Sequence, residues 1–191
     1  VGPPLEQLVA GHAPAEVVAG RSDVAVQAQV HAKAQFPHRV SKLIVVDIAP
    51  KAYKPGHHQY FKAFEEIDWS ALNNRKEIDE ALSAYESNAG VRLFLAKNIE
   101  RVETGGFMVK CHVPALKSAY EEIIGQLHFE RSYTGEVLFI LGADSHYLKE
   151  EDKAYINTYF PLSEYVYIPN AGHWVHADNP KAFYESLVAF L

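Results

Sequence analysis

Three short apolar runs constrain the fold of this chain more than any other feature of its sequence. They are residues 42–47 (KLIVVD), 136–141 (EVLFIL) and 165–168 (YVYI), and a turn-forming segment follows each of them. Apolar runs of this length, rich in β-branched and aromatic residues, are typical of strands that are buried on both faces of a parallel sheet. The sequence therefore predicts an α/β fold with a mostly parallel sheet.

Helical patterns lie between and beyond these strands. Apolar residues recur at helical spacing after Pro180, and an Ala-rich stretch over 24–36 also indicates a helix. The middle of the chain predicts helices over 59–64, 75–87, 90–99 and 114–124, with one short extended piece over 106–110. Strands that alternate with helices indicate parallel pairing, so the helical block is an insertion. We expect 1–50 and 135–191 to form the core and 51–134 a helical cap.

Composition and charge exclude several classes of protein. The 191 residues are 48% hydrophobic and 22% charged, which is enough for one globular domain with a sizeable core. A net charge of −6 argues against a nucleic-acid partner, because phosphate binding needs an excess of Lys and Arg. No run reaches the roughly 18 apolar residues of a membrane span. The single cysteine, Cys111, favours a reducing, cytoplasmic location. Because the chain opens on Val1, we expect it to begin inside a longer protein or after processing.

The segment 170–180 (NAGHWVHADNP) carries the strongest chemical signal. His173 lies on a glycine-containing loop between a predicted strand and the predicted C-terminal helix. In open parallel sheets, functional sites lie outside the carboxyl ends of the strands, so an imidazole at this position is a candidate base. The alternative is a surface histidine on a connecting loop.

Two segments resemble the α/β-hydrolases. Residues 172–177 (GHWVHA) resemble the loop that carries the triad histidine, and residues 45–50 (VVDIAP) resemble a strand end found in small carboxylesterases related to mitochondrial α/β-hydrolase-domain proteins. The resemblance runs from about Phe36 to the C-terminus. It implies an α/β-hydrolase fold with a helical cap, in which this chain lacks the first strands. It also implies that His173 is the base and Asp47 the acid.

The nucleophile of this family sits in a G-x-S-x-G turn between a strand and a helix. Residues 20–24 (GRSDV) give the candidate Ser22, which lies 47 − 22 = 25 residues before Asp47. Val24 replaces the second glycine, where close backbone approach favours a small residue. The alternative for Ser22 is a helix N-cap. The resemblance implies the Asp23 N–H as one oxyanion donor, and the N-terminal part of the chain as missing or divergent.

These residues predict a serine hydrolase, a carboxylesterase or thioesterase that cleaves small or medium acyl esters and needs no cofactor or metal. The alternative is a catalytically inactive α/β-hydrolase-like protein or fragment that acts, if at all, by binding. A carbon–carbon hydrolase or a dehalogenase on the same fold is a third hypothesis, although a dehalogenase needs Asp at the position of Ser22 and Asp23 is one place off. The sequence leaves the oligomeric state open.

Other polar residues are weaker candidates. Asp144 follows the second strand and is the alternative acid, with a turn residue as the competing interpretation. His176 lies close to His173 and is expected to pack or cap. The adjacent pair His57 and His58 is expected in a solvated loop because no other metal-ligating residues flank it. Aromatic residues of the insertion either select the acyl group or bury the cap; they are Tyr53, Tyr60, Phe61, Phe64, Trp69, Phe94, Phe107 and Tyr120.

Overall fold

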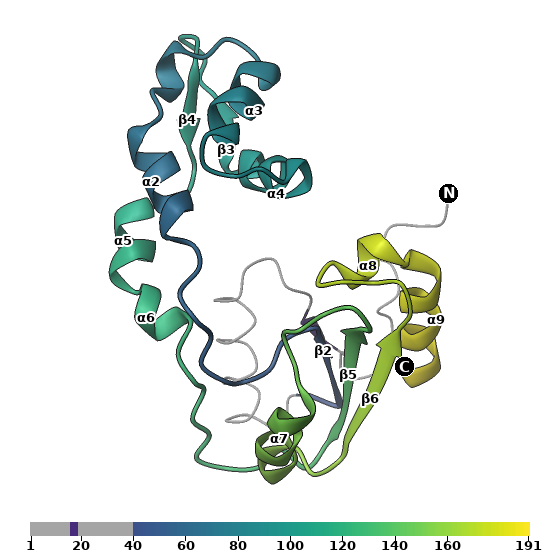
Figure 1. Ribbon diagram of the computed structural model, residues 1–191. Coiled ribbons are helices and arrows are strands. Elements are labelled where there is room, and N and C mark those ends of the chain that lie inside the picture. The colour runs from purple at the N-terminus through teal and green to yellow at the C-terminus, as the bar shows by residue number, and fades with distance from the viewer. Residues whose placement is uncertain (1–15, 19–39) are drawn as a thin grey trace. The chain divides into compact units, whose positions relative to one another are not determined.

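The computed structural model describes residues 16–18 and 40–191 (Figure 1). These residues divide into two compact units. One unit consists of the described residues up to Ala52 together with Ile123–Leu191, and the other of Tyr53–Glu122. The helix predicted over 24–36 lies outside the described residues.

A parallel sheet forms the first unit. Its strands are β1 (Glu16–Val18), β2 (Lys42–Val46), β5 (Glu136–Gly142) and β6 (Ser163–Ile168), in the order β1-β2-β5-β6. Each neighbouring pair is parallel, and the register places Val46 of β2 opposite Ile140 of β5. The predicted α/β class with a mostly parallel sheet is confirmed.

Burial explains why the apolar runs form these strands. Residues 43–46 of β2 and 137–142 of β5 are all buried, as expected for strands covered on both faces, whereas β6 is only partly buried. On one face the C-terminal helix α9 (Pro180–Phe190) contributes Leu187 to a core with Ile44 and Ile140. Each such fully buried aliphatic side chain contributes about 1.5–3 kcal/mol.

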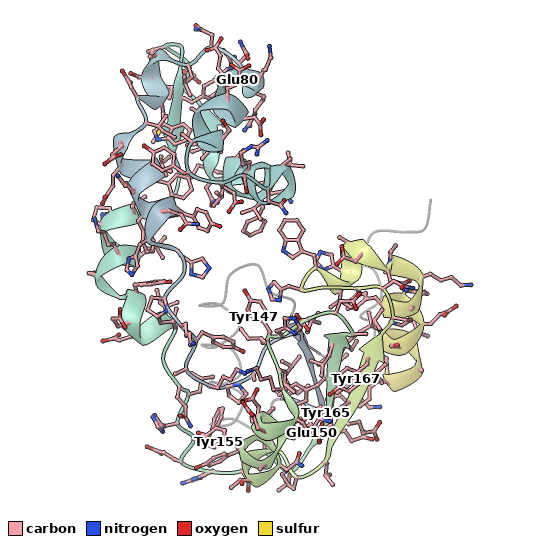
Figure 2. All side chains as sticks on the ribbon, in the orientation of Figure 1. Glu80, Tyr147, Glu150, Tyr155, Tyr165 and Tyr167 are labelled. Carbon is pink, nitrogen blue, oxygen red and sulfur yellow. The ribbon has the colours of Figure 1, made fainter. Side chains whose placement is uncertain are left out.

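The other face of the sheet carries aromatic residues. Phe139 of β5 stacks on Tyr165 of β6, with ring centroids 5.2 Å apart. The ammonium group of Lys153 lies 4.8 Å from the centroid of the Tyr165 ring, so helix α7 (Lys153–Tyr159) adjoins this face (Figure 2). A short 3-10 turn, η5 (Glu150–Asp152), leads into α7, and the side chain of Glu150 pairs with Lys153.

The second unit has its own hydrophobic core. It contains α2 (His58–Glu66), η3 (Trp69–Ala71), α3 (Arg75–Ser83), α4 (Ala89–Leu95), η4 (Ala96–Asn98), β3 (Ile99–Arg101), β4 (Phe107–Val109), α5 (Val113–Ser118) and the start of α6 (Tyr120–Ile123). Its core residues are Ala63, Trp69, Ile78, Leu82, Leu95, Ile99 and Phe107. The aromatic side chains Trp69 and Phe107 therefore pack inside this unit. No helix in the described ranges is long and apolar enough to cross a membrane.

Two local expectations for the insertion were wrong. The helix predicted over 90–99 ends at Leu95, because η4 tightens the last turn and residues from Ile99 onward are extended. Those residues pair as β3 with β4 in an antiparallel hairpin, although the sequence predicted only one extended piece there. A three-residue strand is too short to show a period-2 pattern.

The loops after β5 and β6 meet at the carboxyl end of the sheet. The backbone N–H of Asp144 donates to the carbonyl of Ala171 at 2.9 Å, and that of Ala143 donates to Ile168 at 2.9 Å. A Cβ atom on Gly142 would lie 2.2 Å from the carbonyl oxygen of Gly172 and 2.5 Å from that of Ala171. The close approach of the two loops therefore requires glycine at position 142.

We expect the substitution Gly142→Ala to destabilise the protein by about 1–3 kcal/mol, because the added methyl group forces the loop at 171–172 to move. Urea unfolding followed by circular dichroism measures the change. Gly56→Ala is the matched control: its Cβ would meet nothing closer than 4.0 Å. We expect the control to change stability by less than about 0.5 kcal/mol. Equal effects of the two substitutions would contradict this account.

Candidate active site

Asp47 is the first residue beyond β2, and its backbone turns sharply there. Its φ angle is +49°, in the left-handed region that Asp enters more readily than most residues. Its N–H still donates to the carbonyl of Ile140 at 2.9 Å, so the residue stays attached to β5. Strand pairing and the turn together place the Asp47 side chain at the carboxyl end of the sheet.

The carboxylate of Asp47 is buried and accepts three hydrogen bonds. The side chain is 1% exposed. Oδ1 accepts from the backbone N–H of Gly142 at 3.0 Å, and Oδ2 accepts from the hydroxyl of Ser145 at 2.5 Å. The third partner of the carboxylate is Nδ1 of His173, which lies 2.8 Å from Oδ2. A buried charge is tolerated only when it is bonded in this way.

The loop that carries His173 is held by its own hydrogen bonds. The N–H of Gly172 donates to the carboxylate of Asp178 at 2.8 Å, and the side-chain amide of Asn179 donates to the carbonyl of Pro169 at 2.9 Å. Asp178 ends the short helix α8 (Val175–Asp178), and Asn179 caps α9. These bonds fix the loop at both ends, so the position of His173 follows from the packing of α8 and α9.

The pairing of Asp47 and His173 defines the tautomer of the histidine. An ionised carboxylate only accepts hydrogen bonds, so Nδ1 carries the hydrogen and Nε2 keeps its lone pair. The His173 side chain is 34% exposed, whereas its carboxylate partner is buried. The arrangement is that of a base: a carboxylate orients the ring and stabilises the imidazolium that forms when Nε2 takes a proton.

Tyr147 covers one face of this imidazole. The two ring centroids are 3.8 Å apart and the ring planes differ by 13°. Tyr147 is labelled in Figure 2. Tyr147 lies on the loop after β5, and its N–H donates to the hydroxyl of Ser145 at 3.3 Å. The same loop therefore supplies a donor to the carboxylate and a ring to the histidine.

Comparisons with known proteins agree with this fold. A solved marine microorganism esterase is 33% identical, with a TM-score of 0.83 over 92% of this chain and 69% of that one. The sn-1-specific diacylglycerol lipase ABHD11 of Mus musculus is 34% identical over 164 residues, 82% of this chain and 53% of the relative. Esterase YbfF of Escherichia coli is 29% identical over 154 residues, 80% of this chain and 58% of the relative.

This chain belongs to the α/β-hydrolase superfamily. The predicted resemblance to small esterases and α/β-hydrolase-domain proteins is thereby confirmed. No family model matches the sequence. The chain spans about half the length of the curated relatives that it matches first.

Two of the predicted site residues of this α/β-hydrolase, Ser22 and Asp23, lie outside the described residues. The nearest described segment is β1, whose Val18 pairs with Val45 of β2. This strand runs parallel to β2, which ends at Val46, directly before Asp47. The roles of Ser22 and Asp23 stay predictions.

Asp144, the alternative acid, lies on the loop after β5 and is exposed. Its N–H bonds to the His173 loop at Ala171, but the imidazole bonds to Asp47. The neighbouring Ser145, rather than Asp144, contacts the site through its hydroxyl. Sequence reasoning gave Ser145 no role. The turn segment 142–146 was the available signal, but it does not tell which of its side chains points to the histidine.

The other candidate residues have local structural contacts. His57 lies before α2, where its Nδ1 is 2.8 Å from the hydroxyl of Tyr120. His176, on α8, packs edge-on against Phe183. Burial raises the pKa of the Cys111 thiol, so this side chain favours the neutral thiol over the thiolate.

The imidazole N–H that binds a buried carboxylate gives a proton resonance at low field, so NMR can identify the acid without an activity assay. We expect this resonance in the unmodified protein and in Asp144→Asn. We expect Asp47→Asn to abolish or displace it, because a neutral amide replaces the acceptor. His173→Gln assigns the signal. A resonance that persists unchanged in Asp47→Asn would rule out the pairing described here.

Proposed function

We propose that this α/β-hydrolase is a serine hydrolase that cleaves small or medium acyl esters or thioesters through Ser22, His173 and Asp47. The observation that carries the proposal is the hydrogen bond of 2.8 Å between His173 and the buried carboxylate of Asp47. Esterase and lipase relatives support the same class of reaction.

The position of β1 supports Ser22 as the nucleophile. Val18 lies opposite Val45, and Asp47 follows two residues later, so β1 and β2 end at the same edge of the sheet. Ser22 is 22 − 18 = 4 residues beyond Val18. Four residues of fully extended chain span at most about 14 Å. This spacing is short enough for Ser22 to reach the sheet edge where Asp47 lies, and it supports the assignment.

The proposed reaction proceeds in two acyl transfers. Nε2 of His173 takes the proton of Ser22 as Oγ attacks the acyl carbon, and the Asp23 N–H is one donor to the resulting oxyanion. The imidazolium then gives its proton to the leaving alcohol or thiol, which leaves an acyl-serine. Water, deprotonated by His173, attacks this acyl group, and the carboxylic acid departs as Ser22 recovers its proton.

A fluorophosphonate probe tests the nucleophile directly. We expect stoichiometric labelling at Ser22, and we expect Ser22→Ala to abolish it, because the probe reacts only with an activated serine. Mass spectrometry locates the label. Ser87→Ala removes an exposed serine of the second unit and serves as the control, with labelling unchanged. A folded protein that takes up no label would support the inactive, binding-only alternative.

Hydrolysis of p-nitrophenyl esters from acetate to dodecanoate tests the acid. We expect Asp47→Asn to lower kcat by about 10³–10⁴-fold, since an amide no longer holds the imidazole in its basic tautomer. Asp144→Asn is the matched control, an acid-to-amide change on the neighbouring loop, and we expect kcat within about twofold of the unmodified enzyme. If Asp144→Asn lowered kcat more than Asp47→Asn did, Asp144 and not Asp47 would be the acid.

A further inference from the structure

The stacking of Tyr147 on His173 has no part in the proposed triad, although it is the closest aromatic contact of the site. The ring centroids are 3.8 Å apart and the planes differ by 13°. Aromatic pairs without charge prefer offset or edge-to-face arrangements, with centroids about 4.5–7 Å apart. The Tyr147–His173 pair is nearly parallel and its centroids are closer than that range, so the two rings are in direct face-to-face contact.

The contact has a steric consequence. The imidazole is held by its covalent Cβ–Cγ bond and by the hydrogen bond from Nδ1 to Asp47, and the ring plane can still tilt by rotation about Cβ–Cγ. The phenol ring of Tyr147 covers one face of the imidazole and blocks this tilt in that direction. Because a base needs its lone pair aimed at the proton that it takes, a fixed ring plane helps to direct Nε2.

The contact also has an electrostatic consequence. The face of a phenol ring carries partial negative charge and attracts a cation that lies over it. His173 is a cation only after Nε2 has taken a proton, which in the proposed reaction happens in the transition state. The stack therefore stabilises the transition state more than the resting enzyme, which is the condition for an effect on rate.

We propose that Tyr147 is a positioning residue, whose ring fixes the plane of the His173 imidazole and favours its protonated form. The proposal rests on the proposed function, because it assigns Tyr147 a part in the same reaction. The ring of Tyr147, and not its hydroxyl group, makes this contact.

Other titratable groups surround this pair. The carboxylate of Asp47 contacts the imidazole from the end of β2. On the loop of His173 itself, the carboxylate of Asp178 binds the N–H of Gly172. The loop of Tyr147 also carries Asp144 and His146, both exposed. The test keeps all of these groups and changes only the ring at position 147.

Two substitutions separate the ring face from the other properties of Tyr147. Tyr147→Leu keeps an apolar side chain but removes the aromatic face. Tyr147→Phe keeps the face and removes the hydroxyl. His173 ring resonances, assigned with His173→Gln, report the titration of the imidazole in each variant without any assay of activity. The dependence of kcat/KM on pH reports the same group in the free enzyme.

We expect the NMR titration midpoint to fall by about 0.5 pH unit in Tyr147→Leu, because the variant loses an attraction for the cation. The acidic limb of kcat/KM should move to lower pH by the same amount. On the plateau, kcat/KM should fall by about threefold with KM within about twofold, because the loss is confined to the charged form and 0.5 pH unit corresponds to about a threefold change. Tyr147→Phe should restore both the midpoint and kcat/KM.

An unchanged midpoint in Tyr147→Leu would overturn the proposal. So would a shift in Tyr147→Phe as large as that in Tyr147→Leu, because the hydroxyl would then be responsible. A merely structural role would lower kcat/KM without moving the midpoint. If the unmodified protein hydrolyses no ester and takes up no probe, the proposed function fails, yet the NMR midpoints still decide whether the ring face favours the imidazolium.

Discussion

The buried carboxylate of Asp47 is the interaction on which the arrangement of the site depends. A carboxylate that is 1% exposed is stable only when its oxygens are bonded, and here the donors come from β5, from the loop after β5 and from the histidine loop. These segments are far apart in sequence. The hydrogen bonds to this one carboxylate therefore couple the positions of the three segments. Moving any one segment leaves the buried carboxylate without one of its donors.

The parallel sheet makes this coupling possible. Because β2, β5 and β6 run in the same direction, all of their following loops emerge at one edge. Packing on the two faces of the sheet holds the strands in place. On one face, Leu187 of α9 packs in a core with Ile44, and on the other face Phe139 stacks on Tyr165. The second unit has a separate hydrophobic core of its own.

The sequence predicted the features that depend on local pattern. Continuous apolar runs indicated β2 and β5, and the glycine loop identified His173 as a candidate base. The β3–β4 hairpin was not predictable, because strands of three residues carry too little periodicity. Ser145 and Tyr147 were not predictable as parts of the site either. Their contacts depend on how two loops meet in space, and a turn such as 142–146 does not specify which side chains point inward.

The short contact between Ser145 and Asp47 bears on how such enzymes diverge. The Oγ atom of Ser145 and the Oδ2 atom of Asp47 are 2.5 Å apart, although Ser145 follows β5 and Asp47 follows β2. Neighbouring strands thus deliver side chains to the same point beside the imidazole. An acid placed at the end of either strand would therefore reach the same imidazole. Its position along the chain would differ between the two cases, whereas its position in space would not.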